Sequence, residues 1–496
     1  MSSYHALEER FRRIALVGDA IGVLHWDRSV MMPPGGAAAR GDQIAALTVI
    51  RHAMIIEPAL SEQLDQAAQS SGLDEWQSAN LLEMRRRHRH AAAVPADLVE
   101  ALSKASSACE IQWRDARRNA GYAAILPSFT EVLNLTRRLG EAKAEAFECA
   151  IYDALLDAYE PGGRAADIDP VFDEYAAFLP EFLDAVLARQ ETEAAPVLPP
   201  GPFPIARQKA LVRRMAQAVG LDFESARLDE SLHPFSGGVP EDSRITTRYD
   251  VKDYSQAMMG VLHEVGHAMY ERGLPAAWRL QPVGEARGMT MHESQSLLIE
   301  MQVCRSREFM AWAVPIIRRE FGGAGSAWDA ENLYRLATRV KRGLIRVDAD
   351  EVTYPAHVIL RYRLERAMLS GDLALADLPG AWNDAMQSLL GVTPPNDALG
   401  CLQDIHWYDG AWGYFPTYTL GAMAAAQLFA AATQDRPGIG PALGDGNFKP
   451  LMAWLREHVH GMGSLLPTGA LIEKATGRRF DDAAFKAHLR ARYLVP

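Results

Sequence analysis

The sequence predicts a mainly α-helical fold: one large helical chain with a small β-hairpin element near its middle. Apolar residues recur with a period close to 3.6 over most of the chain, and Ala, Leu, Glu and Arg are abundant. Alternating β-branched residues are confined to one short stretch, at about 228–249. The 496 residues, 48% of them hydrophobic and 23% charged, provide ample material for a large core.

The N-terminal part is predicted to be a series of long helices. The first helix is expected over residues 3–25, where Leu7, Phe11 and Ile14 recur among charged residues. The run Met32-Pro33-Pro34-Gly35-Gly36 must form a turn, and a second helix begins near Ala37. From about 58 to 192 the helical period continues, broken only at prolines.

A stiff connector is expected over 194–204, because six of these eleven residues are proline or glycine. It could divide a helical N-terminal half, about 1–193, from a second half, about 205–496. In that second half we expect a helix over 205–222, a strand over 243–249 and a helix that starts at Asp253 or Ser255 and closes at Gly273. After residue 290 helices resume to the end, interrupted only at 394–397 and 437–441.

Bulk properties exclude several classes of function. The net charge of −12 argues against nucleic-acid binding, and the basic run Arg85–His90 is interpreted as a solvated helix face. Four scattered cysteines indicate neither a disulfide framework nor a thiolate zinc site, and they fit a reducing cytoplasm. We see no signal peptide at the N-terminus and no run of 18 apolar residues, so we expect no membrane span.

The predicted helix over 253–273 carries the pattern His263-Glu264-x-x-His267. Residues four apart lie one above the other on a helix, so both imidazoles face one point, as two ligands of Zn²⁺ must. Glu264 follows the first ligand directly, so its carboxylate can reach a water on that metal. The alternative is a buried amphipathic helix that happens to carry two histidines, and a third ligand would decide between them.

Four acidic residues downstream are candidates for the third ligand: Glu271, Glu285, Glu293 and Glu300. Glu271 lies one turn beyond His267 and points along the helix axis, and Glu285 lies in a glycine-flanked loop. We favour Glu293, at the opening of a helix 26 residues past His267, because that gap allows the chain to reverse. The alternative role for Glu293 is an acid that complements a helix dipole. Leu297, four residues further on, is apolar, so any carboxylate supporting the ligands must come from elsewhere.

Six short patterns now stand in order along the chain, and together they resemble the carboxypeptidase Taq family of zinc metallocarboxypeptidases. They are His233-Pro234-Phe235, Asp242-x-Arg244-x-Thr246, His263-Glu264-x-x-His267, His292-Glu293-Ser294-Gln295, Ile345-Arg346-x-x-Ala349-Asp350 and Gly400-x-x-Gln403-Asp404-x-His406-Trp407. The N-terminal Trp26-Asp27 also looks like the family's opening. The resemblance covers nearly the whole chain.

The resemblance implies a nearly all-helical fold around a deep substrate cleft and one catalytic domain over 1–496, so that the proline-rich connector separates no independent domains. It also implies a zinc-type metal, peptide substrates with a free C-terminus, release of single C-terminal residues and a homodimer. A site of two histidines and a glutamate can hold Zn²⁺, and it can equally hold Co²⁺ or Mn²⁺.

Peptide hydrolysis at such a site needs a general base, hydrogen-bond donors for the oxyanion and residues that bind and position the substrate. Glu264 is the candidate base. His406 and Tyr418, with Tyr414 as the alternative, are the candidate donors, in or just after an aromatic stretch whose glycines would let the backbone approach substrate. Core packing is the alternative for these aromatic residues. Asp404 is expected to orient His406.

A free C-terminus requires a cation, and arginine pairs best with a carboxylate. Arg346 and Arg244 are the candidates, with Arg346 preferred, and structural ion pairs are the alternative role for both. Three functional classes follow for the chain as a whole. They are a metallocarboxypeptidase, a metallo-oligopeptidase or dipeptidyl peptidase in a similar cleft, and a non-catalytic helical peptide-binding protein.

Overall fold

The structure is a computed structural model that describes residues 3–70, 72–231 and 233–495. The chain forms two compact units, each assembled from segments that are distant in sequence. Unit 1 comprises Met1–Ala91, Pro196–Ala337 and Ala424–Phe480, and unit 2 comprises Ala92–Ala195, Thr338–Met423 and Asp481–Pro496. The change of unit at Pro196 falls within the predicted connector over 194–204, which contains no helix or strand.

Unit 1 is built from helices and a small sheet. The helices of its first two segments are α1 (Ser3–Val30), α2 (Ala37–Ile56), α3 (Pro58–Ala68), α4 (Glu75–Ala92), α9 (Ile205–Val219), α10 (Tyr254–Gly273), α11 (Gly288–Leu297), α12 (Arg307–Phe321) and α13 (Ala330–Ala337). Its last segment holds the greater part of α16 (Pro416–Asp435), α17 (Ile439–Gly444), α18 (Lys449–His458) and α19 (Thr468–Thr476). The mainly α-helical fold is thus confirmed.

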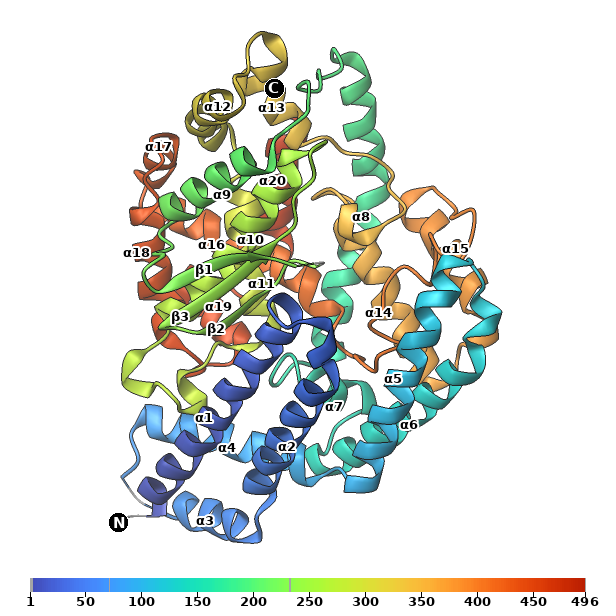
Figure 1. Ribbon diagram of the computed structural model, residues 1–496, viewed down its shortest axis with the longest axis vertical. Coiled ribbons are helices and arrows are strands. Elements are labelled where there is room, and N and C mark those ends of the chain that lie inside the picture. The colour runs from blue at the N-terminus through green and yellow to red at the C-terminus, as the bar shows by residue number, and fades with distance from the viewer. Residues whose placement is uncertain (1–2, 71, 232, 496) are drawn as a thin grey trace. The chain divides into compact units, whose positions relative to one another are not determined.

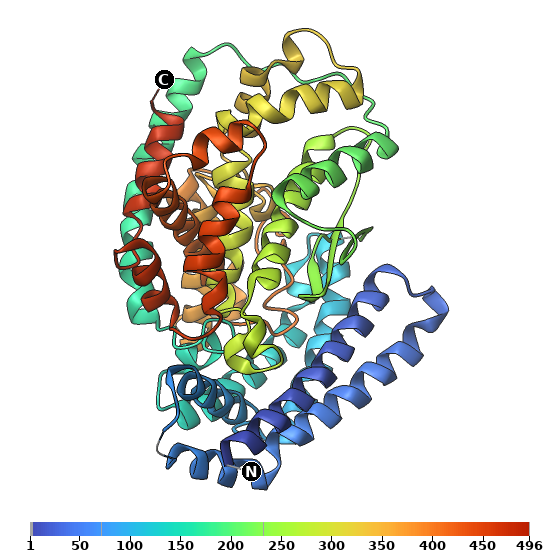
Figure 2. The ribbon, with the colours of Figure 1, turned by 90° about the vertical axis from the view of Figure 1, so that its left-hand side faces the viewer.

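The first helices of unit 1 share a core of their own. Helices α1 and α2 run side by side as a long hairpin (Figure 2), and α1 also packs on α3. Phe11 of α1 and Leu60 and Leu64 of α3 are almost completely buried there. The first helix extends five residues beyond the predicted end at residue 25, so Trp26 is helical, and the proline-glycine run then forms the predicted turn.

The sheet has three strands, β1 (Ala226–Glu230), β2 (Ser236–Val239) and β3 (Asp242–Thr247), in the order β1-β3-β2. Strands β2 and β3 form the predicted antiparallel hairpin, whereas β1 adds to β3 in parallel. The sheet lies beside α10 (Figure 1), and β3, with Ile245 and Thr246 fully buried, packs on that helix. The sheet therefore covers one side of the helix that carries the metal-ligand pattern.

Helix α10 is the centre of unit 1. It begins after Asp253, whose carboxylate accepts a hydrogen bond from the backbone N–H of Ser255 at 2.8 Å, and it ends at Gly273, as the sequence predicts. Almost every residue from Val261 to Tyr270 is buried. A helix whose central turns are buried on all sides is surrounded by protein, and α9, α11 and β3 pack around it.

Helix α11 passes unusually close to α10. A Cβ atom at Gly266 would lie 2.5 Å from the carbonyl oxygen of Gln295 and 2.5 Å from Cα of Ser296, so only glycine fits between the two backbones. Helix α11 begins at Gly288, earlier than predicted, and continues directly into a wider π-helical turn over Leu298–Val303.

Unit 2 is helical throughout its regular structure. Its helices are α5 (Ala96–Arg118), α6 (Leu126–Phe147), α7 (Ile151–Leu156), α8 (Ala165–Thr192), α14 (Tyr354–Ser370), α15 (Leu378–Leu390), the start of α16 and α20 (Ala483–Tyr493). The prediction of only two interruptions after residue 290 is wrong. Residues 338–353 also form irregular chain, with one short 3-10 turn at Arg346–Asp348, and 391–415 contain no helix.

A buried carboxylate joins α20 to the remainder of unit 2. Glu351 is 3% exposed and accepts hydrogen bonds from His488 (2.8 Å), Arg492 (2.9 Å) and Tyr493 (3.1 Å). The preceding residue, Asp350, accepts from the backbone N–H groups of Val352 and Thr353. These contacts fix the irregular chain before α14 against the last helix of the unit.

In the described part of the chain, no individual helix combines the length and apolar character that crossing a membrane requires. One bent pair, Pro34–Ile56 with Pro58–Ala68, reaches that length and composition when its two parts are joined.

Candidate functional site

The metal-ligand pattern places two imidazoles against one carboxylate. The Nε2 atoms of His263 and His267 lie 3.9 Å and 3.5 Å from Oε2 of Glu293. The histidines lie one turn apart on α10, and Glu293 lies in the middle of α11, which Gly266 allows to approach. The ligand atoms of the three residues all lie within 4.8 Å of one another.

This donor set fits a divalent metal. A tetrahedral Zn²⁺ with ligands at about 2.0–2.1 Å separates its donor atoms by about 3.3 Å, close to the two distances to Glu293. The site is also rich in negative charge. Burial alone would lower the pKa of His263, but the carboxylates around it, Glu293 first, raise that pKa to about 10. A bound cation would neutralise this charge.

Glu264 lies on the same turn and is 6% exposed. Burial raises its pKa to about 7, and the charges of His263 and Glu293 also act on it. A carboxylate with a pKa near neutrality suits a group that must both take and return a proton. Burial, together with the neighbouring His292 and His263, holds the pKa of His267 well below its usual value.

Glu300 supports the first histidine, a role that sequence reasoning missed. The Nδ1 atom of His263 lies 3.0 Å from Oε2 of Glu300, and Arg305 donates to the other oxygen at 2.7 Å. Burial alone would raise the pKa of Glu300, but His263 and Arg305 lower it to about 2. Glu300 follows Glu293 by seven residues, and this two-turn spacing was the available signal.

His292 was also missed. Its Nδ1 atom lies 2.6 Å from Nδ1 of His267, and its Nε2 atom lies 2.9 Å from Oε1 of Glu271. The signal was its place beside Glu293, the candidate third ligand, in the same motif. Glu271 is not one of the three clustered donors, yet it contacts the cluster through His292.

Arg244 belongs to unit 1 and is already paired. Its guanidinium donates to Asp242 through Nε (3.0 Å) and Nη2 (2.6 Å), and its Cζ atom lies 5.9 Å from the ring centre of Trp26. Two residues on, the Thr246 hydroxyl accepts from the backbone N–H of Phe235 at 2.9 Å. Three of the sequence patterns thus meet at this sheet, at Trp26, Phe235 and β3.

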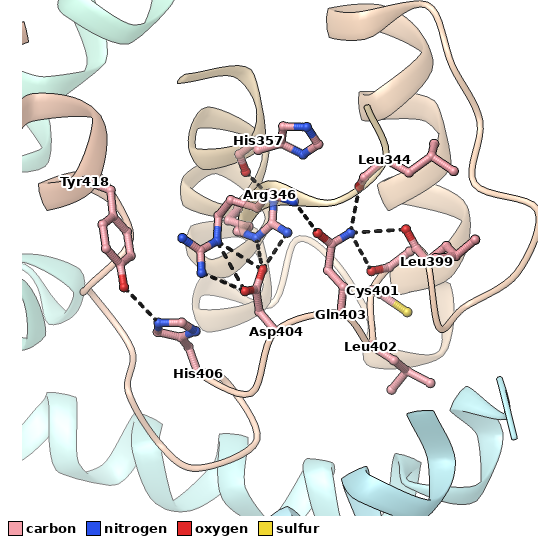
Figure 3. A network of polar contacts seen from close by, with 12 residues as sticks. Leu344, Arg346, His357, Leu399, Cys401, Leu402, Gln403, Asp404, His406 and Tyr418 are labelled. Atoms are coloured by element: carbon pink, nitrogen blue, oxygen red, sulfur yellow. Dashed lines mark hydrogen bonds and ion pairs between the residues drawn. The ribbon is translucent and has the colours of Figure 1, made fainter. Parts of the chain in front are cut away.

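Arg346 lies in unit 2, within a buried ion cluster (Figure 3). Its Nη2 lies 2.8 Å from Oδ1 of Asp404, and Nε of Arg361 lies 2.6 Å from Oδ2. Arg361 is completely buried, and Arg346 is 6% exposed. One carboxylate therefore faces two guanidinium groups, which leaves one positive charge in excess. The ion pair of Arg346 is thus made with Asp404, 58 residues away in sequence, and not with the nearby Asp348 or Asp350.

His406, Tyr414 and Tyr418 gather next to Arg346. The Nε2 atom of His406 lies 3.3 Å from the hydroxyl of Tyr418 (Figure 3), and the Tyr414 and Tyr418 ring centres lie 5.1 Å apart. Cζ of Arg346 lies 4.8 Å from the centre of the Tyr418 ring. All three aromatic candidates are partly exposed, as a group that meets substrate must be.

Asp404 does not make the predicted contact with His406. Its oxygens are held by Arg346 and Arg361, while Nδ1 of His406 is buried with no hydrogen-bond partner among the described residues. Burial and the Arg346 charge lower the pKa of His406 to about 4. The ring is therefore neutral at neutral pH.

Core packing explains the rest of the aromatic stretch. Trp407, Tyr408 and Trp412 are buried, and the ring centres of Phe129 and Tyr408 lie 4.6 Å apart. Gly413 has a φ of +87°, and a Cβ there would lie 2.8 Å from the backbone nitrogen of Leu156. This glycine therefore serves close packing against α7, a role that the sequence did not predict.

Acidic neighbours balance the basic run of α4. Arg85 pairs with Asp65 at 2.6 Å, and Arg86 pairs with Glu83 at 2.8 Å. Arg87 pairs with Glu285. These ion pairs give the run a structural role and account for Glu285, one of the rejected ligand candidates. The face is not the fully solvated one predicted, because all of its residues except Arg89 are partly buried.

Known proteins resemble the chain over its whole length. A sequence model described as "Carboxypeptidase Taq (M32) metallopeptidase" matches residues 6–493. Thermostable carboxypeptidase 1 of Thermus thermophilus is 35% identical over 503 residues, which cover 99% of this chain and 98% of that protein. Among solved structures, metallocarboxypeptidase 1 of Trypanosoma cruzi has a TM-score of 0.97 at 37% identity, with 99% of each chain covered. An M32 carboxypeptidase of Deinococcus radiodurans has a TM-score of 0.94 at 35% identity, again with 99% of each covered.

Proposed function

This chain belongs to the carboxypeptidase Taq (M32) family of metallopeptidases, and we propose that it hydrolyses the C-terminal bond of peptides and releases single amino acids with broad specificity. The observation that carries the proposal is the convergence of His263, His267 and Glu293 beside the buried Glu264. Two imidazoles, one carboxylate and an adjacent base are the set that metal-assisted peptide hydrolysis uses.

We propose Zn²⁺ as the cofactor, with Co²⁺ or Mn²⁺ as ions that the same donors hold. Bound to these three residues, the metal would supply Lewis acidity to the hydrolytic water and to the scissile carbonyl. Glu264 takes the proton of that water on a carboxylate oxygen and then delivers it to the leaving amine. Glu300 keeps the Nδ1 proton of His263 in place, so that Nε2 remains free to act as a ligand.

We further propose that His406 and Tyr418 donate hydrogen bonds to the oxyanion of the tetrahedral intermediate, with Tyr414 as a contact for the substrate. Arg346 is proposed to pair with the terminal carboxylate. The excess positive charge of its cluster with Arg361 and Asp404 supports this assignment. Arg244 remains a proposed substrate contact, and its full engagement by Asp242 makes it the weaker candidate for the carboxylate.

The family resemblance also implies a homodimer, and we propose a cytoplasmic one. The four cysteines, Cys109, Cys149, Cys304 and Cys401, are free, in keeping with a reducing compartment. The acidic net charge and the paired arginines of α4 support peptides, and not nucleic acids, as partners.

The test is amino-acid release from a short N-blocked peptide that carries either a free or an amidated C-terminus. Wild type and Glu264→Gln would each be assayed with Zn²⁺ and with a chelator. The proposal expects one residue to be released from the free acid alone, and expects release to stop with chelator and in Glu264→Gln. Glu62→Gln, the same change of residue type at an exposed position of α3 in the same unit, is the matched control and should remain active.

Other outcomes would select the alternatives. Internal cleavage of the amidated peptide would indicate an oligopeptidase, because only an exopeptidase needs the free carboxylate. Removal of two residues at a time would indicate a dipeptidyl peptidase. Binding of peptides without turnover by Zn²⁺-loaded wild type would indicate a non-catalytic peptide-binding protein.

A further inference from the structure

The two histidines of the ligand cluster are supported in different ways. His263 contacts a carboxylate directly, that of Glu300. The Glu300 side chain is 12% exposed and is itself held by an ion pair with Arg305. Among the described residues, His267 meets no carboxylate on its Nδ1 side. It meets a second imidazole, His292, and only beyond that ring lies a carboxylate, that of Glu271.

The direction of these hydrogen bonds follows from the chemistry of the ring. A histidine that binds metal through Nε2 carries its proton on Nδ1. For His267, whose Nε2 faces Glu293, this proton points at Nδ1 of His292, so that atom must accept. His292 then carries its own proton on Nε2, where Oε1 of Glu271 accepts it at 2.9 Å. Each donor meets one acceptor along the series.

The opposite direction is incompatible with a metal ligand. If Nδ1 of His292 donated, Nδ1 of His267 would have to accept, and the His267 proton would move to Nε2. That proton would point at Glu293, where the metal is proposed to bind. The Glu271 carboxylate accepts only and fixes the proton of His292 on Nε2, so it selects the productive direction.

We propose that Glu271, acting through His292, is a positioning residue that fixes the ring orientation and the tautomer of His267 and thereby strengthens metal binding. This inference rests on the proposed metal site. Groups that fix a ligating histidine in this manner typically contribute about 10- to 100-fold in metal affinity. Glu271 lies one turn beyond His267 on α10, and His292 precedes Glu293 on α11, so the series also joins the two helices.

The test measures Zn²⁺ affinity by competition with a chelator, using the full chain first stripped of metal. The variants are Glu271→Ala, His292→Phe and the double variant, and the control is Glu62→Ala, which removes an exposed acid of α3 in the same unit. The dissociation constant should rise about 10- to 100-fold in each single variant. Glu271→Gln, whose amide oxygen can still accept, should lose less. The control should match wild type.

The double variant tests whether Glu271 acts on His267 through His292. Because Glu271 acts through His292, the double variant should lose no more affinity than His292→Phe alone. Combining Glu271→Ala with Glu300→Gln should instead give losses that multiply, because these residues support different ligands. Thermal unfolding of the metal-stripped variants separates folding from positioning. A purely structural role would lower the melting temperature and leave the affinity of the folded protein unchanged.

Two results would overturn the inference. One is an affinity of Glu271→Ala within twofold of wild type, and the other is a double variant whose loss is the product of the two single losses. If His292→Phe does not fold, Glu271→Ala still decides, because the Glu271 side chain is 38% exposed and its removal creates no large cavity. Wild type that binds no Zn²⁺ would instead contradict the proposed function.

Discussion

Nη2 of Arg346 lies 2.8 Å from Oδ1 of Asp404, and both side chains are almost completely removed from water, at 7% and 11% exposure. The same carboxylate faces the guanidinium of Arg361. These two cations hold the pKa of Asp404 far below its usual value in spite of burial. Asp404 therefore neutralises one of the two buried positive charges.

Removing the Asp404 carboxylate should lower the free energy of unfolding substantially. Asp404→Asn leaves two buried guanidinium groups without a counterion, and breaking a buried pair in this way typically costs about 3–5 kcal/mol. Urea unfolding followed by circular dichroism measures the loss. Asp173→Asn is the control in the same unit, because its partner Arg363 is 47% exposed and such pairs contribute about 0–1 kcal/mol. Equal losses in the two variants would contradict the prediction.

The close approach of α11 at Gly266 predicts that two glycine-to-alanine substitutions in α10 differ in their effects on Zn²⁺ affinity and stability. Gly266→Ala must displace α11, which carries Glu293, so Zn²⁺ affinity should fall at least about tenfold and stability should also fall. At Gly260 the nearest atom to a new Cβ lies 3.7 Å away. Gly260→Ala should keep wild-type affinity and gain up to about 1 kcal/mol from helix propensity. Chelator competition and thermal melting measure both effects. Wild-type affinity in Gly266→Ala would refute the prediction.

Glu365 predicts a dependence of stability on pH. It is fully buried in unit 2, accepts from Tyr152 and from Nε1 of Trp407 (3.0 Å), and burial raises its pKa to about 7. The folded state thus binds the proton more tightly than the unfolded chain, whose pKa is about 4.5. The favourable contribution is complete below about pH 4.5 and is lost as the pH rises to 7.

Glu365→Gln resembles the protonated acid and should remove this loss. Its unfolding free energy should fall less than that of wild type between pH 4.5 and 7, with a difference of up to about 3 kcal/mol at pH 8. Denaturant unfolding at a series of pH values measures it. Glu131→Gln, at an exposed position of α6 in the same unit, should follow wild type. Parallel curves for wild type and Glu365→Gln would show that the raised pKa is absent.

If His406 and Tyr418 are the oxyanion donors, substituting either residue should lower kcat without weakening metal binding. Removing one oxyanion donor typically lowers kcat by about 10²–10³-fold. The kcat of Tyr418→Phe and that of His406→Gln should each fall by this factor, while the affinity for Zn²⁺ stays unchanged. Tyr159→Phe is the control, because its ring contacts Tyr414 at 4.9 Å and loses the same hydroxyl. Steady-state kinetics with saturating Zn²⁺ give the values. A kcat of Tyr418→Phe within twofold of wild type would remove Tyr418 from the proposed mechanism.

Local periodicity was sufficient for most of the helices and for the ligand cluster. His263 and His267 are brought together by the pitch of one helix, and Asp253 and Gly273 mark its ends by their ordinary capping chemistry. The approach of Glu293 followed from the length of the intervening chain. Each of these inferences needs only residues that are close in sequence.

Features that depend on packing between distant segments could not be predicted in this way. Strand β1 pairs in parallel with β3, and nothing in its own residues specifies that partner. Asp404 was expected to face His406, two residues away, but its carboxylate pairs with Arg361 on α14 instead. Glu300 was weighed only as a ligand, and its seven-residue spacing from Glu293 did not by itself show that it would contact Nδ1 of His263 on another helix.

The anchoring of α20 on Glu351 has a consequence for synthesis of the chain. Unit 2 begins at Ala92, yet Glu351 obtains its hydrogen-bond donors from His488, Arg492 and Tyr493. On the ribosome, a nascent chain of 480 residues lacks α20 and therefore all three of these donors. Unit 2 therefore completes its folding only after the whole of α20 has emerged, and chains released early expose an incomplete unit to chaperones and proteases.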